Sequence, residues 1–206
     1  MRRMLTFVTT LAFVALFAMP AQAQEKSLRV GLQGGVTSSN LSGDDVESGS
    51  TSAKTGFFAG GYLNYFLSDN FSLGLELNWL AGLGAKSSSD DSETKLSYFS
   101  FPVSLNAVLP LGEKMWAGLG AGIAANLRLT CDVTIGGSSG STDCKDDTES
   151  VSWSVPLGAG LGYMMSDTAV LWLGARYQLG LSDVVKDASV KLNWWEFVLG
   201  VGFPTG

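Results

Sequence analysis

The fold is decided by an alternating stretch, Phe71–Gly84, which reads FSLGLELNWLAGLG. Successive side chains of a β-strand point to opposite faces, so this stretch predicts a strand with two different surfaces. The apolar face consists of Phe71, Leu73, Leu75, Leu77, Trp79, Ala81 and Leu83, and the other face of Ser72, Gly74, Glu76, Asn78 and Gly82. An apolar face toward lipid and a polar face toward a barrel interior are typical of transmembrane β-barrels.

The same alternation returns along the chain and predicts eight strands. They are Leu28–Thr37, Gly56–Phe66, Phe71–Gly84, Leu96–Leu109, Met115–Leu129, Val151–Met165, Ala169–Leu181 and Leu192–Phe203. An even number of strands is what closure by antiparallel hairpins requires. The predicted fold is therefore all-β, an eight-stranded antiparallel up-and-down transmembrane β-barrel. A soluble ligand-binding barrel of lipocalin type is the rival, but it needs an apolar interior and a polar outside, the reverse of this pattern.

Residues 1–23 have the features of a secretory signal peptide. Two arginines precede a mostly apolar run over residues 4–19, and Ala21-Gln22-Ala23 has the small residues of a cleavage site. A membrane anchor helix is the alternative, but it needs about 20 apolar residues, and two threonines interrupt this shorter run. We therefore expect a cleaved signal peptide over 1–23 and a barrel domain over 24–206.

The connections between the predicted strands alternate in length. Short turns are expected at 67–70, 110–114 and 166–168, and long loops at 38–54, 85–95, 130–150 and 182–189. In outer-membrane barrels the short turns face the periplasm and the long loops face outward. Outward aromatic side chains at both ends of the strands agree with two interfacial girdles.

The charge of the chain excludes one class of partner. Without the two leader arginines, 11 of the 13 basic residues remain against 19 acidic residues, a net charge of −8. Such a balance argues against nucleic acid, whose phosphates attract basic surfaces. Most of the acidic residues lie in the long Ser-, Gly- and Thr-rich loops, where carboxylates are solvated. Outer-membrane lipid, lipopolysaccharide and a surface ligand at the loops are the expected partners of a monomer.

The only two cysteines, Cys131 and Cys144, lie in the longest predicted loop. An exported chain passes through an oxidising compartment, so a disulfide is favoured. Two thiols without any histidine fall short of the usual four ligands of a structural metal site.

Five charged residues fall on inward positions of the predicted strands: Arg29, Glu76, Arg128, Arg176 and Glu196. Eight strands leave an interior just wide enough for side chains to fill, which favours a polar network that plugs the barrel. Counted from the short-turn ends, Glu76, Arg176 and Glu196 lie at a similar mid-barrel depth. Arg176 and Glu196 are on neighbouring strands and are the expected central pair, with Glu76 and Arg128 as exchange partners. A proton or ion path through the lumen is the alternative interpretation of the same residues.

No catalytic, cofactor or metal site is predicted. Outer-membrane barrel lipases, acyltransferases and proteases use a histidine as proton carrier, and this chain has none. Adjacent acids such as Asp90 and Asp91 lie in a Ser-rich loop and are expected to be solvated. The glycine alternation at 118–122 lies inside a strand, with no helix after it, so it is no nucleotide site.

Several segments resemble the small outer-membrane β-barrel family that includes PorT-like proteins and is related in form to OmpX and the OmpA barrel. They are the leader, FSLGLELNWLAGLGAK, YFSFPVSL with Pro102, MWAGLGAGIAANL, SVPLGAGLGYMM and WWEFVLGVGF. Pro102 and Pro156 each remove a donor from a strand ladder, so we expect bulges there or missing bonds met by water. The resemblance implies insertion by the barrel assembly machinery into the outer membrane of a Gram-negative-type bacterium. These motifs specify no chemistry. With the enzymatic and nucleotide-site interpretations set aside, the expected role is structural or a surface interaction through the loops, with a narrow ion or small-solute channel as the alternative.

Overall fold

The computed structural model describes residues 28–46, 51–87, 92–135 and 141–205. The predicted signal peptide lies outside the described residues and stays a prediction. Among the described residues, no helix is long and apolar enough to cross a membrane.

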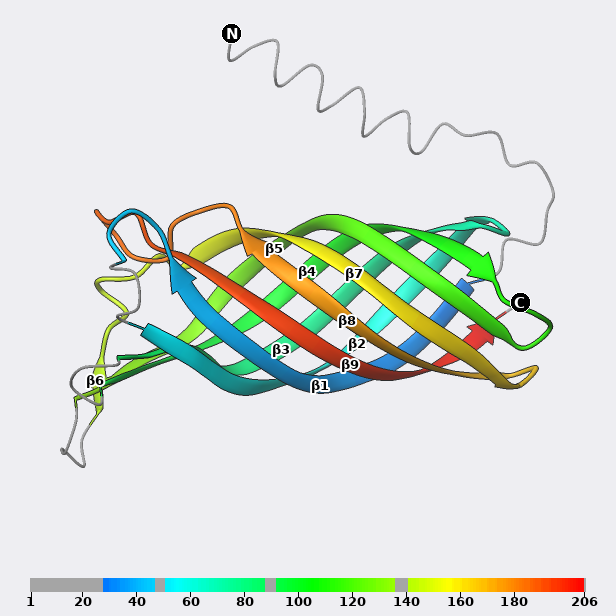
Figure 1. Ribbon diagram of the computed structural model, residues 1–206, viewed down its shortest axis with the longest axis horizontal. Coiled ribbons are helices and arrows are strands. Elements are labelled where there is room, and N and C mark those ends of the chain that lie inside the picture. Colours follow the sequence, from blue (N-terminus) through cyan, green and yellow to red (C-terminus); the bar gives the residue numbers. More distant parts are fainter. Residues whose placement is uncertain (1–27, 47–50, 88–91, 136–140, 206) are drawn as a thin grey trace, which may run out of the picture.

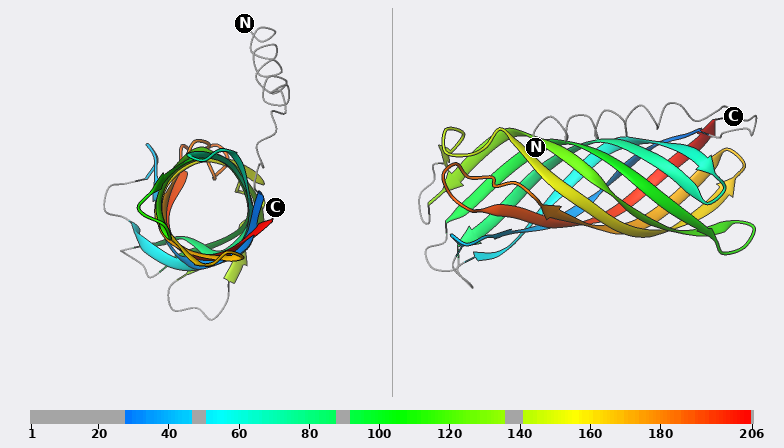
Figure 2. Two further views of the ribbon diagram at one scale, coloured as in Figure 1. Left: turned by 90° about the vertical axis from the view of Figure 1, so that its right-hand side faces the viewer. Right: turned by 90° about the horizontal axis from the view of Figure 1, so that it is seen from above.

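The described residues form a single antiparallel sheet that closes on itself (Figures 1 and 2). Its strands are β1 (Leu28–Ser42), β2 (Thr51–Ser68), β3 (Phe71–Ser87), β4 (Glu93–Pro110), β5 (Met115–Thr134), β6 (Ser141–Asp143), β7 (Val151–Ser166), β8 (Ala169–Gly180) and β9 (Lys191–Thr205). Consecutive long strands pair with one another, and β1 pairs with β9 from Leu28↔Thr205 to Ser42↔Lys191. The short β6 pairs only with the end of β5 and lies among the loops. The prediction of an eight-stranded antiparallel barrel is confirmed.

Continuous pairing around the barrel leads to a test of its behaviour in detergent. A closed barrel has no edge at which unfolding can start, so we expect unboiled protein to migrate faster than boiled protein on detergent gels. The protein should also stay in the membrane pellet during carbonate extraction. Recovery in the soluble periplasm, or identical migration before and after boiling, would contradict this expectation.

The two faces of the strands differ as the alternation predicts. Outward apolar side chains are widely exposed, as at Leu32 (66%), Phe57 (51%) and Leu199 (55%), while inward polar side chains such as Ser100 and Asn126 are buried. A surface of this kind is stable only where the outside is lipid, because a large apolar area in water would drive aggregation.

One predicted side-chain direction is wrong. The register between β3 and β4 shifts between Leu80 and Leu83, where Gly82 has a φ of 77°, so β3 contains one extra residue. A bulge of this kind reverses the direction of the following side chains. Leu83 was expected to point outward, but it is fully buried inside the barrel.

The two strand prolines interrupt pairing without shifting the register. At Pro102 the β3–β4 pairs stop at Leu75↔Val103 and resume at Asn78↔Ser100. At Pro156 the β5–β7 pairs stop and resume in the same way, between Ala121↔Leu157 and Ala124↔Ser154. Of the two expected outcomes, the structure has missing ladder bonds rather than bulges.

The strands continue further into the loops than predicted. β1 extends to Ser42 and β2 begins at Thr51, inside the segment that was expected to be a long loop. The polar alternation of these extensions is weaker, since serine and threonine replace the large apolar residues that mark the strands elsewhere. Ladder pairing with the neighbouring strands stabilises them.

The loop half of the lumen holds an apolar core. It consists of Phe58, Leu80, Leu83, Leu96, Tyr98, Cys131, Val184, Val190, Leu192, Trp194 and Val198. We call this set the loop-end core. Most of its members come from the loop ends of β2, β3, β4, β5 and β9, and two come from the β8–β9 connection. The alternation predicts a polar interior throughout. The structure instead has an apolar interior in the loop half of the lumen.

Candidate functional site

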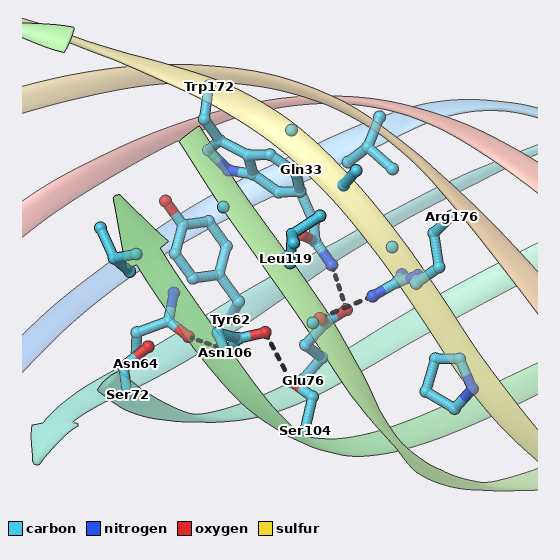
Figure 3. Close-up of a pocket in the computed structure, with 18 of the residues that line it drawn as sticks. Gln33, Tyr62, Asn64, Ser72, Glu76, Ser104, Asn106, Leu119, Trp172 and Arg176 are labelled. Atoms are coloured by element: carbon cyan, nitrogen blue, oxygen red, sulfur yellow. Dashed lines mark hydrogen bonds and ion pairs between the residues drawn. The ribbon is translucent and has the colours of Figure 1, made fainter. Parts of the chain in front are cut away.

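A charged layer crosses the middle of the lumen, next to the loop-end core. Arg176 on β8 lies opposite Glu196 on β9 in the ladder and donates to it through Nε, with Nε–Oε2 at 2.7 Å. Arg176 Nη2 is also 2.6 Å from this oxygen, as an ion pair without hydrogen-bond alignment. From β3, Glu76 reaches the same guanidinium, with Nη1–Oε1 at 2.6 Å (Figure 3). One arginine therefore binds two carboxylates.

Amide and indole groups satisfy the remaining carboxylate oxygens. Glu76 Oε2 accepts from Gln33 at 2.6 Å and from Asn78 at 2.8 Å. Glu196 Oε1 accepts from Trp194 Nε1 at 2.7 Å and from Gln178 at 3.3 Å. A buried carboxylate is tolerated when its lone pairs are satisfied in this way.

The layer continues as a chain of hydrogen bonds along the barrel wall. Ser100 on β4 donates to Asn126 on β5, which donates to Ser154 on β7 at 3.1 Å. Ser154 in turn donates to Gln178 on β8 at 3.0 Å. We call the whole set the central belt: Gln33, Glu76, Asn78, Ser100, Asn126, Ser154, Arg176, Gln178 and Glu196. It ties seven of the eight barrel strands together through side-chain hydrogen bonds and ion pairs.

Two of the five predicted inward charges lie far from this belt. At the loop end of β5, Arg128 Nη1 donates to the carbonyl of Lys145 at 3.0 Å. Arg29, near the short-turn end of β1, lies over the rings of Phe66 (4.9 Å) and Trp116 (5.5 Å). The structure thus brings together Glu76, Arg176 and Glu196 and leaves Arg29 and Arg128 at opposite ends of the lumen.

The loops above the loop-end core are fastened to one another. The backbone of Glu149 donates to the carbonyl of Val184 at 3.0 Å, and that of Lys186 donates to the carbonyl of Asp147 at 2.9 Å. From the β1–β2 connection, the Asp45 carboxylate accepts from the backbone of Ser189 at 2.6 Å. The described residues of these three connections are therefore hydrogen-bonded to one another, and we call residues 43–46, 144–150 and 181–190 the loop cap.

A disulfide joins Cys131 at the end of β5 to Cys144 after β6, which confirms the predicted pair. Cys131 belongs to the loop-end core, so the covalent bond ties the loop cap to the buried side chains beneath it. Nearby, the backbone N–H of Lys145 donates to Asp143 and holds the pKa of that carboxyl below its usual value. Among the described residues, no three acidic or thiol groups gather in a way that could hold a metal ion.

The short-turn half of the lumen contains a cavity of about 130 Å³. Figure 3 shows Glu76 and Arg176 at the end of this cavity that meets the central belt. Its lining continues to Arg29, Phe66 and Trp116 near the short turns. The lumen thus has three layers: an apolar core under the loops, a charged belt in the middle and a polar cavity toward the turns.

Comparison with known proteins places this architecture in a family. The sequence model of the outer membrane protein beta-barrel domain matches residues 9–203. The chain belongs to this family. Family membership confirms the predicted transmembrane barrel and its location in the outer membrane of Gram-negative bacteria. The narrower PorT-like likeness stays a prediction. A comparison with curated protein sequences finds no match.

Solved structures of the same shape are distant in sequence. Neisserial surface protein A is 19% identical, with a TM-score of 0.50, over 87% of this chain and 99% of that one. Ail, the attachment invasion locus protein of Yersinia pestis, is 17% identical, with a TM-score of 0.47, over 88% of this chain and 100% of that one. OprG from Pseudomonas aeruginosa is 14% identical, with a TM-score of 0.49, over 87% and 97%. At these identities the likeness concerns the fold alone.

One buried charged residue of this chain, Lys54, was not predicted from the sequence. Lys54 was placed in a loop, but it lies inward on β2, where its Nζ is 2.7 Å from Glu93 and donates to the carbonyl of Thr94 at 3.1 Å. The parity of the predicted second strand, in which even-numbered residues point inward, would have found it if continued two residues toward the loop. The amides of the belt, such as Gln33 and Gln178, had inward parity too, but parity alone does not reveal which groups bond.

Proposed function

We propose that this outer-membrane protein is a plugged, non-enzymatic barrel with a structural or surface-interaction role. The observation that carries the proposal is the succession of two filled layers, the loop-end core and the central belt. The charged groups of the central belt are paired, and the apolar side chains of the loop-end core are buried. Both observations favour an interior that is closed to water and solutes. The absence of histidine from the sequence supports a role without general acid–base catalysis.

We place the short turns in the periplasm and the loop cap outside the cell, as is usual for such barrels. In this orientation the acidic loops face the medium and the lipopolysaccharide, and a surface ligand would meet the loop cap. Hydrogen bonds among three connections support a fixed outer surface rather than separate loops. Insertion would follow removal of residues 1–23 and use the barrel assembly machinery, and the protein would work as a monomer.

Conductance in a planar bilayer tests the closed interior. We expect purified wild-type protein to give no steady single-channel currents, because ions would have to cross both the central belt and the loop-end core. The currents of the Arg176→Met variant, in which the central belt is strongly weakened, should be recorded for comparison. Steady wild-type currents that change with a substitution at Glu76 or Glu196 would overturn the proposal.

That result would instead support the second candidate, a narrow channel for ions or small solutes. The cavity in the short-turn half favours it, because part of the lumen is already open next to Arg176. A channel would still require rearrangement of the loop cap, which the disulfide and the hydrogen bonds oppose.

A further inference from the structure

The short-turn cavity contains buried polar groups that lack a partner. Tyr62 Oη, Trp116 Nε1, Trp172 Nε1 and Arg29 Nε are all buried and make no hydrogen bond in the described part of the chain. Indole and guanidinium nitrogens can only donate, so this side of the cavity requires acceptor atoms. Among the described residues that line it, Gln33 Oε1 is the one unmet buried group that can only accept, while the Tyr62 hydroxyl can donate or accept. An unpartnered buried donor is costly, which makes an acceptor-rich occupant favourable.

The donors are held in place by the barrel wall. A Cβ added at Gly162 would collide with Trp116, one at Gly200 with Trp172, and one at Gly202 with Tyr62. These aromatic side chains therefore pack against positions where only glycine leaves room. The rings of Tyr62 and Trp172 also contact each other edge to face, with centroids 6.0 Å apart. The wall positions the donors and leaves the space between them open.

One cation of the cavity lining, Arg29, has no ion pair among the described residues, whereas Arg176 is paired with Glu76 and with Glu196 behind it. Arg29, Arg176 and Glu76 are the charged residues of the lining, and the last two are paired with each other at 2.6 Å. Arg29 contacts only aromatic rings within the described residues, and no carboxylate there lies within ion-pair distance of it. A half-buried guanidinium in this position favours an anion, and its planar fork matches a carboxylate.

We propose that the short-turn half of the lumen binds a small carboxylate, with Arg29 as the charged anchor and Tyr62, Trp116 and Trp172 as neutral donors. Val108, Pro156 and Val198 supply an apolar wall for a short hydrocarbon body. The cavity of about 130 Å³ would hold about four water molecules at about 30 Å³ each, or a carboxylate of a few carbon atoms.

Trp116 pairs with Pro110, the last residue of β4, so the site lies beside the short turns and would be filled from that end. Binding there leaves the central belt and the loop-end core in place, and the proposal is thus independent of whether the lumen conducts.

Calorimetry on the refolded mature protein in detergent tests this site, with sodium butyrate as the probe at constant ionic strength. Wild-type protein should bind butyrate saturably and should bind neutral butyramide at least about tenfold more weakly, since a factor of ten corresponds to one lost charged interaction of about 1.4 kcal/mol. Chloride should also bind more weakly, because it keeps the charge but lacks the two oxygens that match the guanidinium fork. Arg29→Gln should weaken butyrate binding by about tenfold and Tyr62→Phe by about threefold. Quenching of indole fluorescence should follow the same binding curve, because two tryptophans line the cavity.

Arg128→Gln is the matched control, because it removes an interior arginine at the loop end, away from the cavity. Its butyrate affinity should equal that of wild type, and heat-modified migration on gels should show that every variant is folded. No saturable heat up to about 50 mM butyrate would mean that only water fills the cavity and would overturn the proposal. Equal binding of butyramide, tighter binding of inorganic phosphate, or full butyrate affinity in Arg29→Gln would overturn it too.

Discussion

Replacing Arg176 with methionine is expected to destabilise the folded barrel by about 3 to 5 kcal/mol, the range for removing one partner from a buried ion pair. Arg176 is the only cation in contact with Glu76 and Glu196 among the described residues, and Glu196 is only 1% exposed. Without the guanidinium, two carboxylates would face each other across a narrow lumen. Unfolding by guanidinium chloride in detergent, followed by heat-modified migration, measures the change in the free energy of unfolding.

A triple variant separates the ion pairs from simple packing. Glu76→Gln, Arg176→Met and Glu196→Gln together remove every charge from the belt while keeping side chains of similar size. This combination should cost much less than Arg176→Met alone, because no unpaired charge remains. Glu196→Ala should fall between the two, since Arg176 keeps Glu76 as a partner. A loss below about 1 kcal/mol for Arg176→Met would mean that water reaches the carboxylates, as it does at exposed ion pairs, and the plugged interior would be wrong.

The face of each strand could be predicted from the sequence, and counting from the short turns placed Glu76, Arg176 and Glu196 at one level, but the contacts of the other inward charges could not be predicted. Alternation is a local property, because neighbouring side chains must point in opposite directions. Depth depends on strand tilt and stagger around the whole barrel. Arg29, Arg128 and Arg176 share an inward face, and only Arg176 meets the two glutamates. The pair Arg176–Glu196 was accessible to sequence reasoning because consecutive strands joined by a hairpin place them nearly opposite each other.

The loop-end core was not predicted because its components look unrelated in the sequence. Val184 and Val190 lie in a connection, Cys131 had been assigned to a loop, and Leu83 had been assigned to the lipid face. Each reaches the core through a feature that alternation does not encode. The β8–β9 connection folds inward, β5 contains an irregularity between Arg128 and Thr130, and β3 contains the bulge at Gly82.

Leu83→Ala tests the bulge directly and should destabilise the barrel by about 2 to 5 kcal/mol, the range for truncating a fully buried leucine. Part of this cost is the lost transfer of apolar atoms, and part is the cavity left in a packed core. Leu77→Ala is the matched control, because Leu77 is on the same strand, is 49% exposed and faces outward. Lipid chains would close around the shortened Leu77 side chain, so only the transfer part is lost there. We therefore expect Leu83→Ala to exceed Leu77→Ala by about 1 to 2 kcal/mol in the same unfolding experiment. Equal losses at the two positions would mean that Leu83 faces lipid and that the strand alternates through Gly82 without a bulge.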